Sequence, residues 1–267
     1  MNRPPTASHD HAAGGDAIAP PPRRRFASPS LAVAGLLATL IATPAGAQPV
    51  LTLRQGQAWV SSSDLRLETS RGTDVVLRDV AWFADSYRSP IYYGVGLTWW
   101  LPRHREWGVG LDVTHAKAIL DGGESVLASG RVDGAPIDRP VVTRDVIGRL
   151  ELSHGLNLAT VSGYRRWLAA PRHDLPQGVS LYLGVGAGVA VPHVEADLGG
   201  ARTDRYQLAG LAARGVVGLD VPFDEHVSLV GEAILSWADL HGDLAGGGSF
   251  ETTLLVPQLS LGIALRD

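Results

Sequence analysis

Short stretches of the chain alternate between apolar residues and small or polar ones. The clearest is "VSLYLGVGAGVAV" at 179–191, where valine, leucine and one alanine hold the odd positions and serine, tyrosine, glycine and alanine hold the even ones. A period of two is typical of a β-strand with two unlike faces. The same period runs through "IYYGVGLTWWL" at 91–101, "WGVGLDV" at 107–113 and the segment at 255–265. These segments therefore predict strands.

Eight alternating segments can be counted along the chain, the weakest of them around "QAWVSSSDLRL" at 57–67. The others lie at 156–168, 206–221 and 227–237, together with the four above. An even number of strands of about ten residues is the signature of a small outer-membrane barrel. We predict an all-β fold, an eight-stranded antiparallel transmembrane up-and-down β-barrel after a cleaved signal peptide, which passes several times through the outer membrane of a Gram-negative bacterium.

The connections agree with this topology, because short periplasmic turns and longer outward loops should alternate. The short turns are expected at 102–106, 169–178 and 222–226. The long loops are expected at 69–89, 120–151, 192–205 and 241–251.

The two faces of the strands decide between a membrane barrel and a soluble one. In a soluble sandwich or lipocalin-like barrel the apolar face points inward and the other face meets water. Here that other face is mostly glycine and alanine, which makes a poor water-facing surface but a good lining for a narrow lumen. We therefore expect the apolar face to contact lipid. Arg214 and Glu232 then fall on the lumenal side of neighbouring strands, where a structural ion pair would fill the barrel.

The first 47 residues are expected to lie outside the barrel domain. Three arginines at 23–25 precede the apolar run "LAVAGLLATLIA", and Ala45-Gly46-Ala47 follows. This order is typical of a signal peptide, with cleavage before Gln48. Residues 1–47 are thus interpreted as an N-terminal extension and signal peptide, and residues 48–267 as the barrel. The barrel-assembly machinery is an expected partner, although the chain ends in "ALRD" and not in the aromatic residue usual for such substrates.

Composition narrows the chemistry. The chain has no cysteine, which excludes disulfides and thiolate catalysis, and its formal net charge of −4 gives no indication of nucleic-acid binding. No flavin, nicotinamide or other cofactor motif is identifiable. Lys117, in "DVTHAKAIL", is the only lysine. A lysine amine can lose its proton when it is desolvated, whereas a guanidinium practically cannot.

Polar residues converge at the outer ends of neighbouring strands. The predicted strand directions bring "THAK", "SHGLN" and "PHVE" to one rim, and with them proton-transfer and hydrogen-bonding groups. Strict alternation turns His115 and Lys117 toward lipid and Asp112 toward the lumen, where it could simply pair with Arg214. His193 and Glu195 could ligate a divalent metal, though two ligands are a weak signal. Rim histidines can also be merely solvated, and Lys117 can simply contact lipopolysaccharide phosphate.

Four strings carry a resemblance to a known family: "EWGVGLDVTHAKAI", "HGLNLATVSGYRRW", "YLGVGAGVAVPHVE" and "YQLAGLAARGVVGLDVPF". They resemble the lipid A oxidase family of outer-membrane barrels, over residues 92–223. The resemblance implies oxygen-dependent oxidation of the proximal glucosamine of lipid A to an aminogluconate, with lipid A or lipopolysaccharide as the partner. The candidate catalytic residues are His115, Lys117, His193, Glu195, Asn157 and Asp112.

The roles of these residues form a hypothesis. His115 or His193 would take a proton from the sugar hydroxyl, Lys117 would hold a phosphate or developing oxyanion, and Glu195 would orient a histidine or a cation. A non-enzymatic barrel with a structural or partner-binding role is the alternative. A lipid A deacylase ranks third, because Ser153 and His154 are adjacent and alternation sends them to opposite faces.

Overall fold

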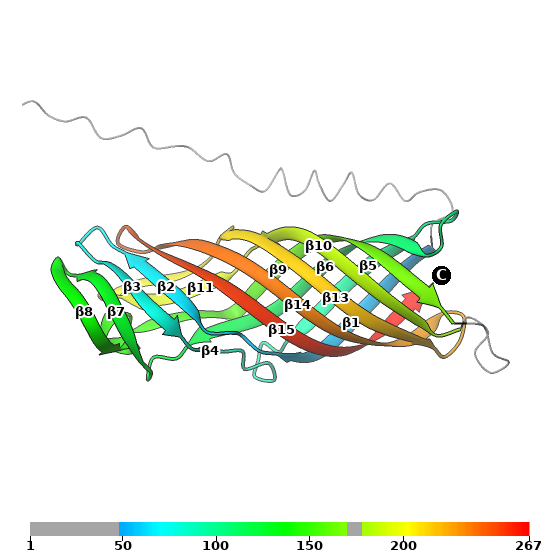
Figure 1. Ribbon diagram of the computed structural model, residues 1–267, viewed down its shortest axis with the longest axis horizontal. Coiled ribbons are helices and arrows are strands. Elements are labelled where there is room, and N and C mark those ends of the chain that lie inside the picture. The colour runs from blue at the N-terminus through cyan, green and yellow to red at the C-terminus, as the bar shows by residue number, and fades with distance from the viewer. Residues whose placement is uncertain (1–47, 170–177, 267) are drawn as a thin grey trace, which may run out of the picture. The chain divides into compact units, whose positions relative to one another are not determined.

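The computed structural model describes residues 48–169 and 178–266, of which nearly all belong to antiparallel strands (Figure 1). The predicted signal peptide and most of the turn predicted at 169–178 lie outside the described residues. The elements are β1 (Gln48–Ala58), β2 (Ser63–Glu68), β3 (Asp74–Val80), β4 (Trp82–Phe83), β5 (Tyr93–Trp100), β6 (Trp107–Leu120), β7 (Ser125–Val132), β8 (Ala135–Val142), α2 (Thr143–Val146), β9 (Arg149–Leu168), β10 (Ser180–Ala190), β11 (His193–Leu198), β12 (Ala201–Tyr206), β13 (Gly210–Pro222), β14 (Val227–Leu244) and β15 (Gly248–Arg266).

Eight strands close into a ring, as predicted. Their order is β1-β5-β6-β9-β10-β13-β14-β15, and β15 pairs back with β1. Every pair in the ring is antiparallel. Closure satisfies the backbone hydrogen bonds of each strand without leaving an edge, which hydrocarbon requires.

Among the described residues, no helix is long and apolar enough to span a membrane.

The wall of the ring is apolar on its outside. On β10, Leu181, Leu183 and Val185 are exposed, and the side chain of Tyr182 points inward and is buried. Val185 is 64% exposed, and similar values hold for outward leucines on β13 and β15. A band of exposed leucine and valine around a closed barrel fits hydrocarbon and not water. The prediction of an apolar exterior is confirmed, and the protein is an outer-membrane β-barrel.

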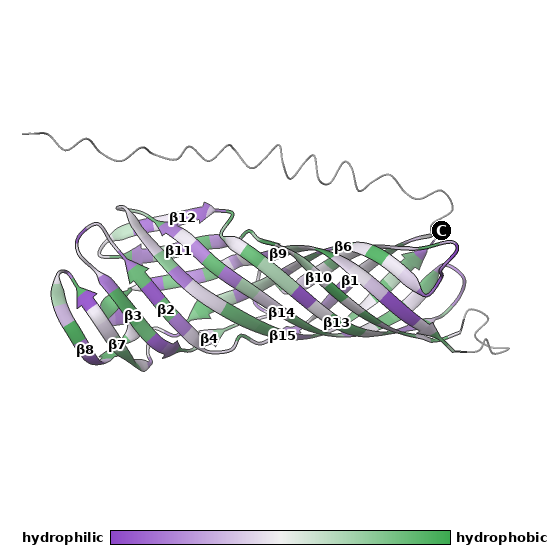
Figure 2. Cartoon of the chain, turned by 45° about the horizontal axis from the view of Figure 1, so that its top comes forward, coloured by the Kyte–Doolittle hydropathy of each residue, from purple (hydrophilic) through white to green (hydrophobic). Residues whose placement is uncertain are grey.

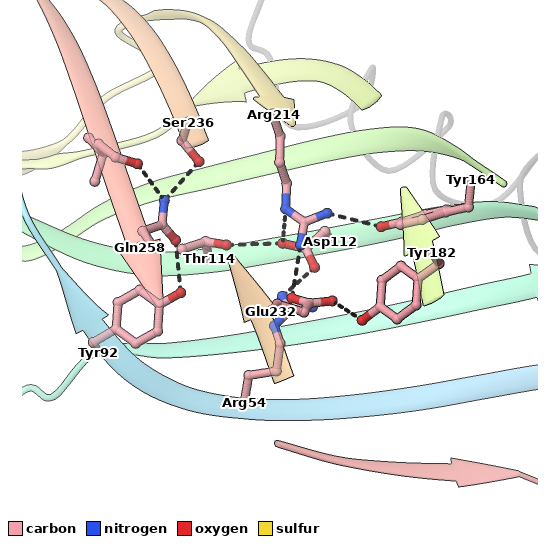
Figure 3. A network of polar contacts seen from close by, with 11 residues as sticks. Arg54, Tyr92, Asp112, Thr114, Tyr164, Tyr182, Arg214, Glu232, Ser236 and Gln258 are labelled. Atoms are coloured by element: carbon pink, nitrogen blue, oxygen red, sulfur yellow. Dashed lines mark hydrogen bonds and ion pairs between the residues drawn. The ribbon is translucent and has the colours of Figure 1, made fainter. Parts of the chain in front are cut away.

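The lumen is filled by a charged cluster (Figure 3). Arg54 contacts Asp112, and its Nη1 lies 3.2 Å from Glu232 Oε2. Arg214 Nη2 lies 3.2 Å from the same oxygen, which confirms the predicted Arg214–Glu232 pair. The hydroxyl of Tyr182 donates to Glu232 Oε1 at 2.6 Å. The two positive and two negative side chains thus balance in charge, and all four are almost completely buried.

The outer part of the molecule is built from strands where the sequence predicted loops. The segments 69–89, 120–151, 192–205 and 241–251 contain β3, β4, β7, β8, β11 and β12 and the ends of β14 and β15. The predicted first strand at 57–67 is also wrong, since β1 ends at Ala58 and β2 pairs with the outer end of β15. We call β2, β3, β7, β8, β11, β12 and the outer ends of β9, β14 and β15 the extension; β7 and β8 lie at the end of the barrel opposite to the C-terminus (Figure 1).

The extension has its own apolar core on the inward side of its strands. Its members share almost complete burial and come from strands whose outward residues are charged or polar: Leu65, Leu67, Leu77, Leu150, Leu152, Leu240, Phe250 and Leu254. Charged residues in "DLRLE" and "DVVLRDV" face water on these strands, and this is why "DVVLRDV" resembled a loop. Hydropathy continues to alternate along the strands of the extension (Figure 2). There the apolar residues are the buried ones.

Candidate functional site on the outer wall

The change from an apolar to a polar exterior gives the level of the membrane surface on the wall. Going outward along β6, Val113 is the last exposed apolar residue before His115. Going outward along β9, the half-buried Ala159 comes before Asn157. His115 and Asn157 are paired across the two strands, and Tyr93 on β5 pairs with His115 from the other side. These three residues therefore lie where the apolar band ends, at the depth of lipid headgroups.

His115 is held in one orientation and one tautomer. Asn157 Nδ2 donates to the carbonyl of Val191 at 3.1 Å, so its Oδ1 faces His115 Nδ1 at 2.9 Å and accepts the proton of that nitrogen. The imidazole stacks on the Tyr93 ring with centroids 4.7 Å apart. Nε2 of His115 is buried beneath the surface and has no hydrogen-bond partner among the described residues. The lone pair that could accept a proton is consequently on Nε2.

Gly155 leaves the space that this arrangement requires. Its φ is +124°, and a Cβ at this position would stand 2.7 Å from the Asn157 side chain and from Cε1 of His115. A side chain would therefore displace the pair of residues as well as strain the backbone.

Lys117 sits in an irregularity of β6. The pairing of β6 with β9 shifts register between Ala116 and Ala118, and the Lys117 amine donates to the carbonyl of Arg88 at 2.6 Å. Lys117 is only 3% exposed, so its side chain is almost completely shielded from solvent. This amine lies beyond the apolar band, and burial lowers its pKa below the ordinary value; the negative charge of Asp85 opposes the shift and the positive charge of Arg88 adds to it.

A second group gathers around Glu195 on β11. His154 Nδ1 contacts Glu195 Oε1, and His193 Nδ1 lies 3.7 Å from the same oxygen. Arg149 Nη2 lies 2.8 Å from the other oxygen, Oε2. The carboxylate is thus held from one side by a guanidinium and faces two imidazoles on the other.

The two groups lie on neighbouring strands, since β6 pairs with β9 and β9 pairs with β11, and His115 and Lys117 are almost completely buried. Glu151 pairs with Glu195 across β9 and β11, and Arg149 bridges them, with Nε 2.8 Å from Glu151 Oε1. Burial alone would raise the pKa of Glu151, but the hydrogen bond and charge of Arg149 hold it below the ordinary value. We call this group of residues the outer belt; its members are Tyr93, His115, Lys117, Arg149, Glu151, His154, Asn157, His193 and Glu195.

Asp112 does not belong to the outer belt. The resemblance placed it among the candidate catalytic residues, but its carboxylate is buried in the lumen against Arg54, and Thr114 Oγ1 donates to it at 3.0 Å. Its nearest contact with Arg214 is 3.6 Å. The side chain points to the opposite side of the wall from His115, as alternation predicted, so the structure does not bring Asp112 together with the other candidate residues.

Ser153 and His154 also depart from alternation. An irregularity of β9 between Leu152 and Leu156, where Gly155 has a positive φ, lets both side chains reach Glu195 Oε1, with Ser153 Oγ donating to it at 3.1 Å. The argument that placed them on opposite faces is wrong. Even so, the Ser153 hydroxyl donates to a carboxylate and not to an imidazole, so it lacks the base that a hydrolytic serine needs.

The sequence analysis did not identify Tyr93, Arg149 and Glu151 of the outer belt, nor Arg88 and Asp204, which contact its members Lys117 and His193. Arg149 and Arg88 fell in predicted loops, and Asp204, whose Oδ1 lies 3.1 Å from His193 Nε2, fell in another. Period-two alternation in "ARTDRY" was the one signal that could have placed Asp204 on the same outward face as Tyr206.

No protein-family model and no curated protein sequence matches the chain. Among solved structures, the outer membrane protein AlkL is similar at 15% identity and a TM-score of 0.41, over 83% of this chain and 90% of AlkL. Neisserial surface protein A follows at 9% identity and a TM-score of 0.37, over 81% and 96%. The outer membrane protein OprG from Pseudomonas aeruginosa shows 12% identity and a TM-score of 0.34, over 83% and 94%. At these values the assignment to outer-membrane barrels rests on the closed ring and its exposed apolar wall.

Proposed function

We propose that this outer-membrane barrel oxidises the proximal glucosamine of lipid A to an aminogluconate. The observation that supports lipid A as substrate is the position of the outer belt. It faces away from the lumen and begins where the apolar wall ends, at the depth where the sugar and phosphate of an outer-leaflet lipid lie. The reaction type comes from the resemblance of the belt sequences to lipid A oxidases.

The surface beside the outer belt has the chemistry of a lipid site. A hollow of about 530 Å³ is lined by Trp59, Phe83, Ile119 and Arg88 among others, and Arg88 is also the residue that binds Lys117. The aromatic and aliphatic residues would contact an acyl chain. Arg88, Lys117 and Arg149 supply positive charge, which favours phosphate.

The proposed reaction takes two electrons and two protons from the anomeric carbon and its free hydroxyl, and dioxygen accepts them to give a lactone and hydrogen peroxide. Water then opens the lactone to the acid, so that the sugar gains one oxygen atom overall. His115 Nε2 is the candidate base for the hydroxyl proton, because Asn157 keeps the proton of the ring on Nδ1. Electron transfer to dioxygen needs a redox centre. The imidazoles of His154 and His193 and the carboxylate of Glu195 fit a divalent metal ion that would supply it.

A structural role is the second candidate, and the filled lumen favours it. Four buried charged side chains close the interior, so the barrel provides a stable wall and no open pore. In that case the outer belt would bind lipopolysaccharide phosphates and divalent cations without chemistry.

Mass spectrometry of lipid A separates these functions. Cells that express the chain should show lipid A with one additional oxygen, and His115→Gln should lower this product by about 10²- to 10⁴-fold, as loss of a general base does. Lys117→Arg keeps the charge but cannot titrate, and we expect it to lose the product as well. His241→Asn is the matched control, because His241 is an outward histidine outside the belt, paired with Glu251. Unmodified lipid A in every strain would favour the structural role, and loss of an acyl chain would indicate hydrolysis.

A further inference from the structure

We propose that His154, His193 and Glu195 bind a divalent transition-metal ion on the outside of the barrel wall. The ligand atoms of these three side chains lie within 4.8 Å of one another. Metal–nitrogen and metal–oxygen bonds of about 2.0–2.2 Å put the donors of one ion about 3–4 Å apart, so only small side-chain movements are needed. The residues come from β9 and β11; Glu195 lies in the paired part of these strands, opposite Glu151, and His154 and His193 lie just beyond it.

His193 presents a lone pair that has no partner. Its Nε2 lies 3.1 Å from Asp204 Oδ1, so in a neutral imidazole a proton on Nε2 would face this carboxylate and Nδ1 would carry the lone pair. Nδ1 is buried, lacks a hydrogen-bond partner among the described residues, and lies 3.7 Å from Glu195 Oε1. A lone pair and a carboxylate oxygen repel each other at this distance unless a cation or a proton lies between them. Asp204 in turn would orient the imidazole as a carboxylate commonly orients a metal-binding histidine.

The carboxylate of Glu195 is also held by polar partners behind it. Arg149 Nη2 lies 2.8 Å from Oε2, and this leaves Oε1 turned toward both imidazoles. Ser153 Oγ donates to Oε1 at 3.1 Å, which fixes the carboxylate further. Polar partners behind each ligand are a general property of metal sites, and here each of His193 and Glu195 has one.

The donor set selects the class of metal. Two imidazoles with one carboxylate suit Fe²⁺, Mn²⁺, Co²⁺ or Zn²⁺, whereas Mg²⁺ and Ca²⁺ prefer oxygen donors alone. Three protein ligands leave coordination positions open, as in catalytic metal sites. His154 is 58% exposed in its side chain, so the open side faces the surroundings at headgroup depth. A part for this ion in sugar oxidation rests on the proposed function, but binding of the ion does not.

The competing explanation is a network without metal. In that network a proton occupies the gap, and an imidazolium pairs with Glu195 beside Arg149. The two explanations differ in what a metal titration shows.

The test titrates the full chain, folded in detergent micelles and free of any affinity histidines, with Co²⁺ alone. Visible absorption and calorimetry should show one high-affinity Co²⁺ per chain. Glu195→Gln and His193→Gln should each weaken this binding by at least about 100-fold, and Asp204→Asn should weaken it by about 10- to 100-fold because only the orientation of His193 is lost. His241→Asn is the matched control, since His241 Nδ1 also lies 3.0 Å from a glutamate, Glu251, but no second histidine is near it in the described structure.

Variants that retain the heat-dependent gel mobility of a folded barrel are compared, so loss of fold is not mistaken for loss of a ligand. Equal Co²⁺ binding by the wild-type chain and Glu195→Gln, or an equal loss in His241→Asn, would overturn the metal site. A chain that binds Co²⁺ through these residues while lipid A stays unmodified in cells would uphold the site and refute the proposed oxidation.

Discussion

In the membrane-spanning part of β15, Leu259 and Leu261 point outward and Gln258 and Ser260 point inward. In the outer part of the same strand, Leu254 and Phe250 point inward and Thr253 points outward. The apolar residues thus change from the outward to the inward side of β15, while the backbone continues without a break and stays paired with β14 throughout. The difference follows from the solvent, because the apolar side of a strand turns toward hydrocarbon in the membrane and toward a packed core in water.

The largest expected difference in unfolding free energy is between an ion pair in the lumen of the membrane-spanning part and one in the extension. Asp112→Asn leaves Arg54 and Arg214 in the lumen with one anion, Glu232, and should cost about 3–5 kcal/mol of unfolding free energy. Asp64→Asn removes the partner of Arg78 in the extension, where both side chains are about half exposed, and should cost less than about 1 kcal/mol. Urea unfolding in micelles measures both. Equal losses of unfolding free energy would mean that water reaches the ion pairs in the lumen.

The next effect tests the apolar wall directly. Leu261→Arg places a charge on the lipid-facing side of β15 and should destabilise the folded barrel by about 2–4 kcal/mol in a bilayer. Thr253→Arg, on the same side of the same strand but in the extension, should change the stability by less than about 0.5 kcal/mol. Unfolding from lipid vesicles gives the comparison. If Thr253→Arg proves the more harmful, the membrane level inferred here is wrong.

The smallest effect is a pH dependence in the outer belt. The pKa of Glu151 is lower in the folded chain than in the unfolded one, so its contribution to stability is present above the ordinary carboxyl pKa and is lost as pH falls through the lowered value. Solvent access limits it to below about 1 kcal/mol.

Glu151→Gln should therefore lose slightly less stability than the wild-type chain between pH 7 and pH 3, measured by urea unfolding at each pH. An identical loss in the two proteins would show that Arg149 does not stabilise the charged carboxylate.

Alternation located seven strands of the ring, because a membrane strand must present an apolar side to lipid over its whole width, but it placed the first strand at 57–67 and missed β1. It did not predict the extension, because strands in water can carry arginine and aspartate on one side, as β3 does, and so resemble loops. Strand direction was sufficient to bring His115, Asn157, His193 and Glu195 to one rim. The contacts of Lys117 and Ser153 could not be predicted, because each depends on a local irregularity of β6 or β9 that shifts a side chain out of strict period two.

The β14–β15 hairpin runs as one ladder from Val227 and Leu265 to Leu244 and Gly248, across both regions. Its turn lies at 245–247, so each new rung joins residues that the previous rung has already brought near. The seam between β1 and β15 instead joins the first and last strands of the chain. The entropy of closing a long loop therefore falls on that seam, and the hairpin can form early while ring closure comes late.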